Sequence, residues 1–349
     1  MLEIKNLKKK LNNFTLEINN LKIENNDYFV FLGLSGSGKT TLLEIIAGFR
    51  KADEGKLILN GEDITKKPIN ERKIVMCNGR YLFPHLTVKE NIGFGIIKEK
   101  NNKKIEKIKN ICKILKIEHL LNRYPKNLSM GEQQRVALAM ALVLEPEIIL
   151  LDEPLSSLDR LIHEKLLYEL REIYNNSNIT FIHVTHDFNE AIALAKHMAI
   201  IRNGKIEQMG TVDEILKKPK NKFIAEFTGV RNLLNGSIRE ENGKYIFSNG
   251  KIDIHIDYEC QCGGALIGIR PEDIMIISHC KCNYRNENIY SGKIVEIFPS
   301  SLCTYRVILN VNGLNLNCEV VKCKADKMQL KKDSDVNFCI TTAIPIKEL

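Results

Sequence analysis

Residues 33–41 read GLSGSGKTT, and they connect the apolar run 28–32 to a helix-spaced apolar segment at 42–49. The stretch fits the pattern G-x-x-x-x-G-K-[ST], in which a buried strand delivers a loop and a helix begins where the loop ends. This order of strand, loop and helix predicts an α/β fold that carries a phosphate-binding loop.

Phosphate binding by such a loop has a simple physical basis. The glycines let the backbone curl with its N–H groups pointing inward, and the new helix adds free N–H donors and the positive end of its dipole. We expect Lys39 to neutralise the β- and γ-phosphates and the Thr40 hydroxyl to ligate Mg²⁺. The predicted nucleotide-binding residues are Gly33, Leu34, Ser35, Gly36, Ser37, Gly38, Lys39, Thr40 and Thr41.

Length and composition bound the other possibilities. With 349 residues the chain exceeds the size at which one core usually stops growing, so we expect two domains. No run of 18 apolar residues and no signal-peptide pattern occurs, which favours a cytoplasmic protein. The net charge of +8 comes from lysines that are scattered and are not interleaved with aromatic residues, so we expect no nucleic-acid partner.

The cysteines are concentrated in the second part of the chain. Eight of the ten lie after position 259, and four of them form the pairs Cys260-x-Cys262 and Cys280-x-Cys282. Reducing surroundings argue against disulfides, and the spacing is tighter than that of structural zinc sites. Free thiols are therefore favoured over a metal or redox role, which stays open.

Two acidic residues follow a second buried strand. The apolar run 148–151 shows no alternation, and Asp152 and Glu153 emerge at its carboxyl end, where ligands bind in doubly wound sheets. Asp152 suits Mg²⁺ binding and Glu153 suits polarising the water that attacks the γ-phosphate. The strand 179–184 ends beside His186, which we expect to contact the γ-phosphate.

A second helix start is predicted at residues 128–135, LSMGEQQR. Ser129 and Glu132 form a capping box, and the glycine at 131 leaves this helix start open to a phosphate. Near the N-terminus, in a region of short alternating strands, Phe14 either stacks on an adenine ring or is an ordinary inward-facing strand residue. The lysine- and isoleucine-rich segment 98–122 predicts an amphipathic helix.

The ordered set GLSGSGKT, LSMGEQQR, IILLDEP, SSLD and THD resembles the ATP-binding subunit of ABC transporters over residues 1–229. The resemblance implies a P-loop NTPase of the ABC type with a helical subdomain at about 86–145, acting as a homodimer that hydrolyses ATP. It implies that Ser129, Gly131 and Glu132 complete the ATP site of the opposite subunit, that Glu153 and His186 are catalytic, and that Asp159 is the D-loop residue. It also implies that Thr40, Asn78 and Asp152 hold Mg²⁺ and that Phe14 stacks on adenine.

The sequence departs from this family at two of these positions. A glutamine normally stands where Asn78 is, and its side chain is one methylene longer. A glycine normally follows the signature serine, where this chain has Met130. Either change could slow hydrolysis, but Lys39, Glu153 and His186 are intact, so an active ATPase is still expected.

Residues 230–349 resemble the small all-β, OB-like domain of the TOBE or molybdate-binding type that solute importers carry. GVRNLLNG at 229–236, IGIRPED at 267–273 and YSGKIVEI at 290–297 carry this resemblance. With LFPHLTV, it points to a molybdate or tungstate importer. Lys293, Ser300 and Ser301 are candidates to bind the oxyanion, or form an ordinary turn.

The implied partners are two membrane permease subunits, an extracytoplasmic solute-binding protein and the cytoplasmic face of the membrane. Phe83 and Pro84 are expected to face the permease. Importers of sulfate, iron, polyamine or sugar remain alternatives, as do a non-transport ABC ATPase, an oxyanion-sensing module and a weakly hydrolysing regulatory subunit.

Overall fold

The computed structural model describes residues 1–77, 82–156, 158–256, 259–277 and 288–346. The chain divides into two compact units, Met1–Val212 and Asp213–Leu349. Sequence reasoning placed the boundary at 229/230, after two short helices that belong to the second unit in the structure. These helices are α7 (Val212–Lys217) and α8 (Lys222–Phe227).

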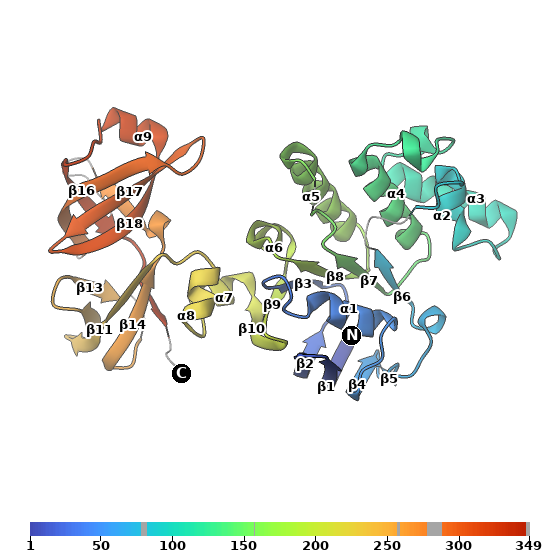
Figure 1. The fold of residues 1–349 in the computed structure, drawn as a ribbon, viewed down its shortest axis with the longest axis horizontal. Helices are drawn as coiled ribbons and strands as arrows, with labels where there is room; N and C mark the ends of the chain where they lie inside the picture. The colour runs from blue at the N-terminus through green and yellow to red at the C-terminus, as the bar shows by residue number, and fades with distance from the viewer. Residues whose placement is uncertain (78–81, 157, 257–258, 278–287, 347–349) are drawn as a thin grey trace. The chain divides into compact units, whose positions relative to one another are not determined.

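A six-stranded sheet forms the centre of the first unit, in the order β10-β9-β3-β8-β7-β6 (Figure 1). Its strands pair in parallel except for β10 at the edge. The central strand β3 is buried throughout because neighbours cover both of its faces. The strands are β3 (Tyr28–Leu32), β6 (Ile74–Cys77), β7 (Ile148–Asp152), β8 (Thr180–Thr185), β9 (His197–Arg202) and β10 (Lys205–Thr211).

A smaller antiparallel sheet, β2-β1-β4-β5, shares one apolar core with the central sheet and with α1 (Lys39–Ala47) (Figure 1). Its strands are β1 (Leu2–Leu11), β2 (Phe14–Ile23), β4 (Glu54–Leu59) and β5 (Glu62–Asp63). β1 and β2 are longer than the short segments that alternation predicted. The polar residues on their open faces interrupt the pattern without ending the strands.

Helices between β6 and β7 form the expected helical subdomain. They are α2 (Val88–Phe94), α3 (Asn101–Ile114) and α4 (Met130–Leu142). The predicted capping box of Ser129 and Glu132 at the start of α4 is confirmed, and Thr87 and Glu90 form a second capping box at the start of α2. The sheet continues into α5 (Arg160–Asn175) after β7 and α6 (Phe188–Leu194) after β8.

The second unit is built from two five-stranded antiparallel sheets with a common core, as predicted for an all-β domain. One sheet has the order β13-β12-β11-β14-β20, with β11 (Asn232–Glu241), β12 (Lys244–Ser248), β13 (Asp253–Ile256), β14 (Gly263–Ile269) and β20 (Ile344–Ile346). The other has the order β15-β19-β16-β17-β18, with β15 (Ile274–Ile277), β16 (Ile289–Pro299), β17 (Thr304–Val311), β18 (Leu314–Val321) and β19 (Asp335–Ile340). A short helix, α9 (Lys322–Lys327), follows β18.

Two sets of side-chain hydrogen bonds connect distant segments of the second unit. The Cys318 thiol on β18 donates to the Ile274 carbonyl on β15, so the two edges of one sheet curl toward each other. The Arg270 guanidinium donates to the carbonyls of Leu216 and Thr228, which ties the chain at the ends of α7 and α8 to this unit. This long-range contact accounts for a division at 212/213, earlier than the 229/230 boundary that the family resemblance implied.

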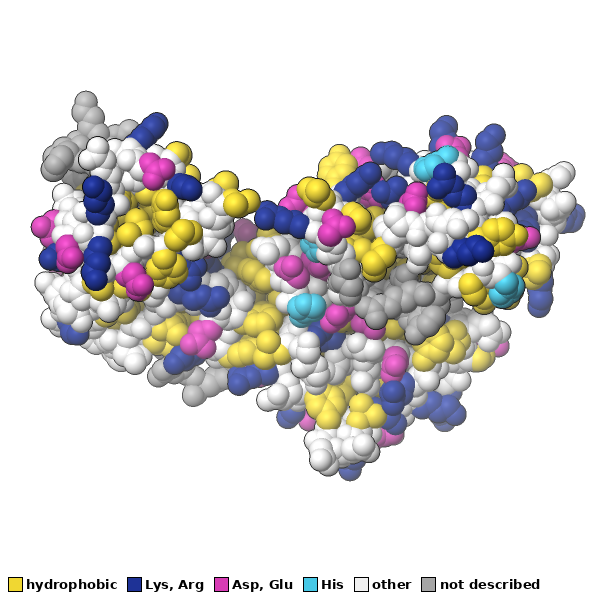
Figure 2. Space-filling model, turned by 45° about the horizontal axis from the view of Figure 1, so that its top comes forward, with side chains coloured by type: hydrophobic (Ala, Val, Ile, Leu, Met, Phe, Trp, Pro, Cys, Tyr) yellow, Lys and Arg dark blue, Asp and Glu magenta, His cyan; other side chains and the backbone are white. Residues whose placement is uncertain are grey.

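Charged side chains of both signs are interspersed on the face shown in Figure 2. Lysine and arginine side chains on that face do not form a continuous stripe in either unit. Within the described residues, none of the helices combines the length and the apolar character needed to cross a bilayer.

Candidate functional site

The loop between β3 and α1 requires glycine at two positions. A Cβ at Gly33 would lie 2.3 Å from the Ile201 carbonyl oxygen. Gly38 has a φ of 99°, in the left-handed region, and a Cβ there would lie 2.8 Å from the Phe14 ring. The loop therefore sits tightly against β9 and β2, which fixes its path before the helix begins.

The Lys39 side chain folds back from the start of α1 to the beginning of this loop. Its ammonium group donates to the Gly33 carbonyl at 2.8 Å and to the Leu34 carbonyl at 2.9 Å. Burial lowers the pKa of Lys39, while the carboxylates of Glu153 and Asp152 oppose that shift. The cation is thus held at the loop and close to the two acidic residues.

The Ser37 hydroxyl is buried within the same loop and has no hydrogen-bond partner among the described residues. A buried hydroxyl usually has a partner, because leaving it unpaired costs about 1–3 kcal/mol. The oxygen of a bound phosphate would satisfy it. This observation fits the loop as the site of a phosphate-bearing ligand.

Thr40 and Asp152 meet at the carboxyl end of β7. The Thr40 hydroxyl donates to Asp152 Oδ1 at 3.1 Å. Burial raises the pKa of Asp152, and the hydrogen bond from Thr40 partly offsets this shift. A hydroxyl and a carboxylate in contact are a donor set that suits Mg²⁺, which prefers oxygen ligands.

Glu153 and His186 form a second pair beside the first. Glu153 Oε1 lies 3.3 Å from His186 Nδ1, and the backbone N–H of Glu153 donates to the Val184 carbonyl at 2.9 Å. Glu153 has a φ of 44°, a strained conformation for a residue with a side chain. The hydrogen bond to the Val184 carbonyl on β8 fixes the backbone of Glu153 in this conformation, in which its carboxylate lies beside His186.

The predicted signature residues form a separate site. Ser129 and Glu132 bond to each other's backbone N–H groups, and Met130 is 57% exposed at the first position of α4. A hollow of about 610 Å³ at this helix start is lined by Ser129, Gly131 and Glu132, with the basic residues Lys116, His119, Arg135 and Lys165 around them. None of the phosphate-loop residues lines it, so one subunit does not bring the two motifs together.

Three predicted site residues remain: Phe14, Asp159 and Asn78. Phe14 lies against Gly38 at the loop and also packs on the core, so both interpretations of this aromatic residue stay open. Asp159 caps α5 by accepting from the Ile162 N–H at 3.1 Å. Asn78 lies outside the described residues.

The phosphate-loop helix has a partner that sequence reasoning missed. The Arg72 guanidinium is buried and donates to the Ile45 and Ile46 carbonyls near the end of α1, and also to the carbonyls of Lys67 and Thr65. A cation at this end of the helix complements its dipole. A single arginine between a turn and a strand gives no signal in sequence, because its partners lie up to 27 residues away.

Replacing Arg72 with Met is expected to lower the free energy of unfolding of the first unit by about 2 kcal/mol or more, since buried carbonyls lose a charged donor. Urea denaturation followed by circular dichroism measures this change. Arg50→Met is the control, because Arg50 is partly exposed and pairs with Glu44. We expect the control to cost less than about 1 kcal/mol, and equal losses in the two variants would contradict the capping role.

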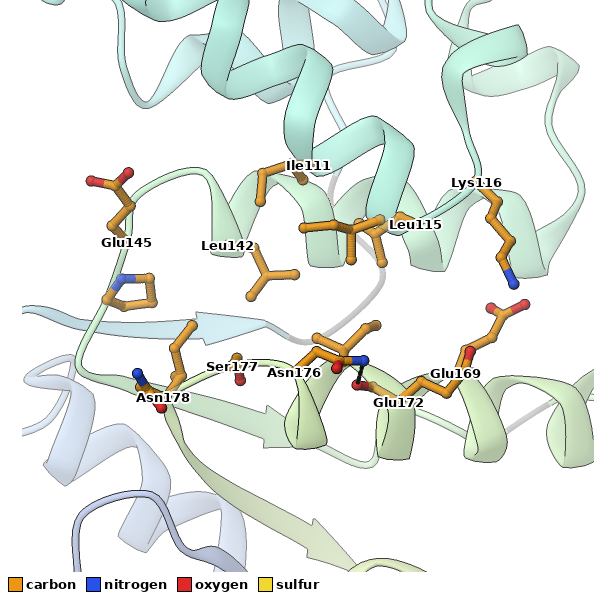
Figure 3. A pocket seen from close by; sticks show the side chains of 14 residues that line it. Ile111, Leu115, Lys116, Leu142, Glu145, Glu169, Glu172, Asn176, Ser177 and Asn178 are labelled. Atoms are coloured by element: carbon orange, nitrogen blue, oxygen red, sulfur yellow. Dashed lines mark hydrogen bonds between the residues drawn. The ribbon is translucent and has the colours of Figure 1, made fainter.

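A different cavity, of about 630 Å³, lies between α3, α4 and α5 (Figure 3). Its floor is apolar, and its rim carries three carboxylates and one lysine, with Glu145 at the end opposite Lys116 (Figure 3). The residues concerned are Ile111, Leu115 and Leu142 in the floor and Lys116, Glu145, Glu169 and Glu172 at the rim. Carboxylates repel phosphate, so this cavity does not suit a nucleotide.

The residues suggested for oxyanion binding in the second unit do not converge. The Ser300 and Ser301 hydroxyls bond to Thr304 in the turn between β16 and β17, and Ser300 also donates to the Glu319 carboxylate. Lys293 pairs with Asp333 at 3.2 Å instead. The geometry at Ser300 and Ser301 favours the ordinary-turn interpretation.

The cysteine pairs are only partly described. Cys280 and Cys282 lie outside the described residues, and none of the described cysteines, including Cys260 and Cys262, forms a disulfide. Within the described ranges, the one group of metal-ligating side chains that comes together contains no cysteine. Among the described residues, Cys260 and Cys262 belong to no such metal-ligating group.

Comparisons with known proteins agree with the site. Residues 16–156 match the ABC transporter family model. The chain is 36% identical to the molybdate/tungstate import ATP-binding protein WtpC of Pyrococcus abyssi, over 98% of each chain. It is 38% identical to the spermidine/putrescine import ATP-binding protein PotA of Clostridioides difficile, over 90% of this chain and 89% of PotA.

Solved structures share the fold of the first unit. One is the dimeric, post-hydrolysis structure of the ATP-binding cassette MJ0796 bound to ADP and Pi. It is 28% identical with a TM-score of 0.53, and the match covers 61% of this chain and 99% of that cassette. Together with the phosphate loop and the two acidic residues at the end of β7, these similarities show that the chain belongs to the ATP-hydrolysing, ATP-binding subunits of the ABC transporter family.

Proposed function

We propose that this subunit energises the import of molybdate or tungstate. The observation that carries the proposal is the 36% identity to WtpC of Pyrococcus abyssi over 98% of both chains, which includes the second unit as well as the ATPase unit. The resemblance of 229–236, 267–273 and 290–297 to the importers' β-domain supports the same conclusion.

At the nucleotide, each predicted residue has a distinct task. Lys39 binds the β- and γ-phosphates, and Thr40 and Asp152, already in contact, hold Mg²⁺ with Asn78. Bound Mg²⁺ supplies charge neutralisation at the phosphates. Glu153 accepts the proton of the attacking water, and His186 at 3.3 Å from it orients that carboxylate and contacts the γ-phosphate.

We infer that two copies of the chain complete each other's ATP sites. The signature hollow is lined by the start of α4, four basic side chains and the two carboxylates Glu132 and Glu169, and it contains none of the loop residues. A helix start with more basic than acidic side chains around it, apart from the phosphate loop of its own subunit, suits the ATP held by a second copy. The dimeric state of the MJ0796 cassette supports this arrangement.

The remaining partners follow from the importer assignment. We place the dimer at the cytoplasmic face of the membrane, against two permease subunits that receive substrate from an extracytoplasmic solute-binding protein. Phe83 contacts Phe94, which is 51% exposed, with their rings tilted by 42°, and this apolar pair together with Pro84 is the proposed permease contact. Oxyanion sensing by the second unit is part of the proposal, with Lys293 as a remaining candidate.

Polyamine import is the second candidate, because the identity to PotA of Clostridioides difficile is 38%. The two cargoes differ in charge, so uptake separates them. Cells that lack the gene are expected to lose tungstate uptake that excess molybdate competes for, while spermidine uptake continues.

Reintroducing the gene should restore tungstate uptake, and a copy with Glu153→Gln should not restore it. Loss of spermidine uptake with intact tungstate uptake would overturn the oxyanion assignment in favour of the polyamine one. If neither uptake changes, both assignments fail.

A further inference from the structure

Glu190, on α6, is a buried carboxylate with a histidine on each side. Its Oε1 lies 2.8 Å from His163 Nε2 on α5, and its Oε2 lies 3.3 Å from His183 Nε2 on β8. The Glu190 residue is 4% exposed and His183 is fully buried. α5 and α6 lie side by side next to β8, so the carboxylate is enclosed by three elements (Figure 1).

Hydrogen bonding determines where the protons lie in this cluster. Tyr28 on β3 lies with its hydroxyl 3.1 Å from His183 Nδ1, and burial raises the pKa of Tyr28, so the phenol keeps its proton. If Tyr28 donates to Nδ1, the proton of His183 is on Nε2, which faces Glu190 Oε2 at 3.3 Å without forming a well-aligned hydrogen bond. The opposite tautomer would place a lone pair against a carboxylate.

The carboxylate stays charged despite its burial. Burial alone would raise the pKa of Glu190, but the interactions with the nearby His183, Thr185 and His163 side chains outweigh it and lower the pKa to about 2. Asp187, whose carboxylate lies within 4.8 Å of the ligand atoms of His163 and Glu190, adds a second negative charge. The environment of position 163 therefore favours a hydrogen-bond donor that can carry positive charge.

The side chains of this cluster lie close in sequence to two residues of the proposed ATP site, Asp159 and His186. The backbone N–H of His163 donates to the Asp159 carbonyl at 2.9 Å, so the ring stands one turn from that residue. Glu190 lies in the first turn of α6, which begins directly after His186 and Asp187. His183 precedes His186 on β8 and its connection by three residues. The Glu190 carboxylate therefore connects the strand before His186, through His183, with the helix after it.

We propose that Glu190, hydrogen-bonded to His163 and in close contact with His183, is a positioning residue that joins the start of α5 at Asp159 to the segment that carries His186. Glu190 does not contact nucleotide in this arrangement. It fixes the orientation of His186 relative to Glu153, so the cluster acts on the rate of the hydrolytic step rather than on ATP binding. The inference rests on the proposed role of His186.

The chain offers a matched control for a purely structural ion pair. His197 Nδ1 lies 2.9 Å from Asp27 Oδ2, and Asp27 is also 4% exposed. Asp27 precedes β3, at the end of the sheet opposite the phosphate loop. Removing His197 leaves the buried Asp27 without its histidine, whereas removing His163 leaves Glu190 beside His183. The change at position 197 also lies away from His186.

Steady-state ATPase kinetics of the full-length protein test the proposal, with His163→Gln, His163→Arg, His197→Gln and His186→Ala as variants. We expect His163→Gln to lower kcat by roughly tenfold with KM nearly unchanged, because a small misplacement of a catalytic group is costly. His163→Arg should restore kcat, since a guanidinium keeps the bond to the carboxylate and its charge. His197→Gln and His163→Gln should lower the melting temperature by similar amounts, but His197→Gln should leave kcat unchanged.

Each contrary result has a defined meaning. If His163→Gln leaves kcat unchanged, or lowers it only as much as His197→Gln does, while His186→Ala abolishes turnover, the positioning role is wrong and the role of His186 stands. Failure of His163→Arg to restore kcat would also overturn the inference. If His186→Ala itself retains full turnover, the proposed role of His186 falls, and the positioning role falls with it.

Discussion

Glu153→Gln is expected to lower the kcat of ATP hydrolysis by at least about 100-fold, because a positioned general base contributes about 10² to 10⁴ in rate. The amide has the same shape but cannot accept the proton of the attacking water. The strained backbone at Glu153, held by the bond to the Val184 carbonyl, should not change. ATP should therefore still bind.

Single-turnover hydrolysis and equilibrium ATP binding measure the two effects separately. Size-exclusion chromatography with ATP should also show the variant accumulating as a dimer, if two copies close over nucleotide. Glu164→Gln is the control, since Glu164 is an exposed residue on α5 that pairs with Arg160. A Glu153→Gln rate within a few-fold of the unmodified protein would rule Glu153 out as the base.

Lys39→Ala is expected to weaken ATP binding by roughly 2 to 3 kcal/mol, or about 30- to 160-fold in Kd, as charge-assisted hydrogen bonds to phosphate are lost. The variant also loses the bonds from the ammonium group to the Gly33 and Leu34 carbonyls, so its melting temperature should fall as well. Isothermal titration with ATP measures the affinity.

The control for this change is Lys51→Ala, an exposed lysine after α1. Its affinity for ATP should match that of the unmodified protein. Should Lys39→Ala bind ATP as tightly as Lys51→Ala, the loop would not be the phosphate site, whatever its sequence.

The sequence predicted those features whose cause is local. A glycine pattern next to a helix start, a capping box and an acid pair after an unbroken apolar run each lie within a few residues, so GLSGSGKTT, Ser129 with Glu132, and Asp152 with Glu153 could be located without a structure. The class of fold followed from the order of these features and is confirmed.

Features that depend on distant partners could not be predicted. Arg72 caps a helix far from it in sequence, and Glu190 meets His163 across 27 residues. Alternation also underestimated β1 and β2, because strands with one solvated face tolerate polar runs that look like turns. The candidate oxyanion residues failed to converge because proximity in sequence does not fix where side chains point.

The attachment of α8 to the second unit affects where the chain can be cut. Ala225 belongs to a small apolar cluster with Val230, Leu266 and Ile346, and the Thr228 carbonyl accepts from Arg270. Cleavage at residue 229 would separate α8 from the residues that cover Ala225. The ATPase fragment would then end in a helix with an exposed apolar surface, which favours aggregation. A fragment that ends near Val212 leaves α8 with its natural neighbours, so the hydrolytic part is best isolated there.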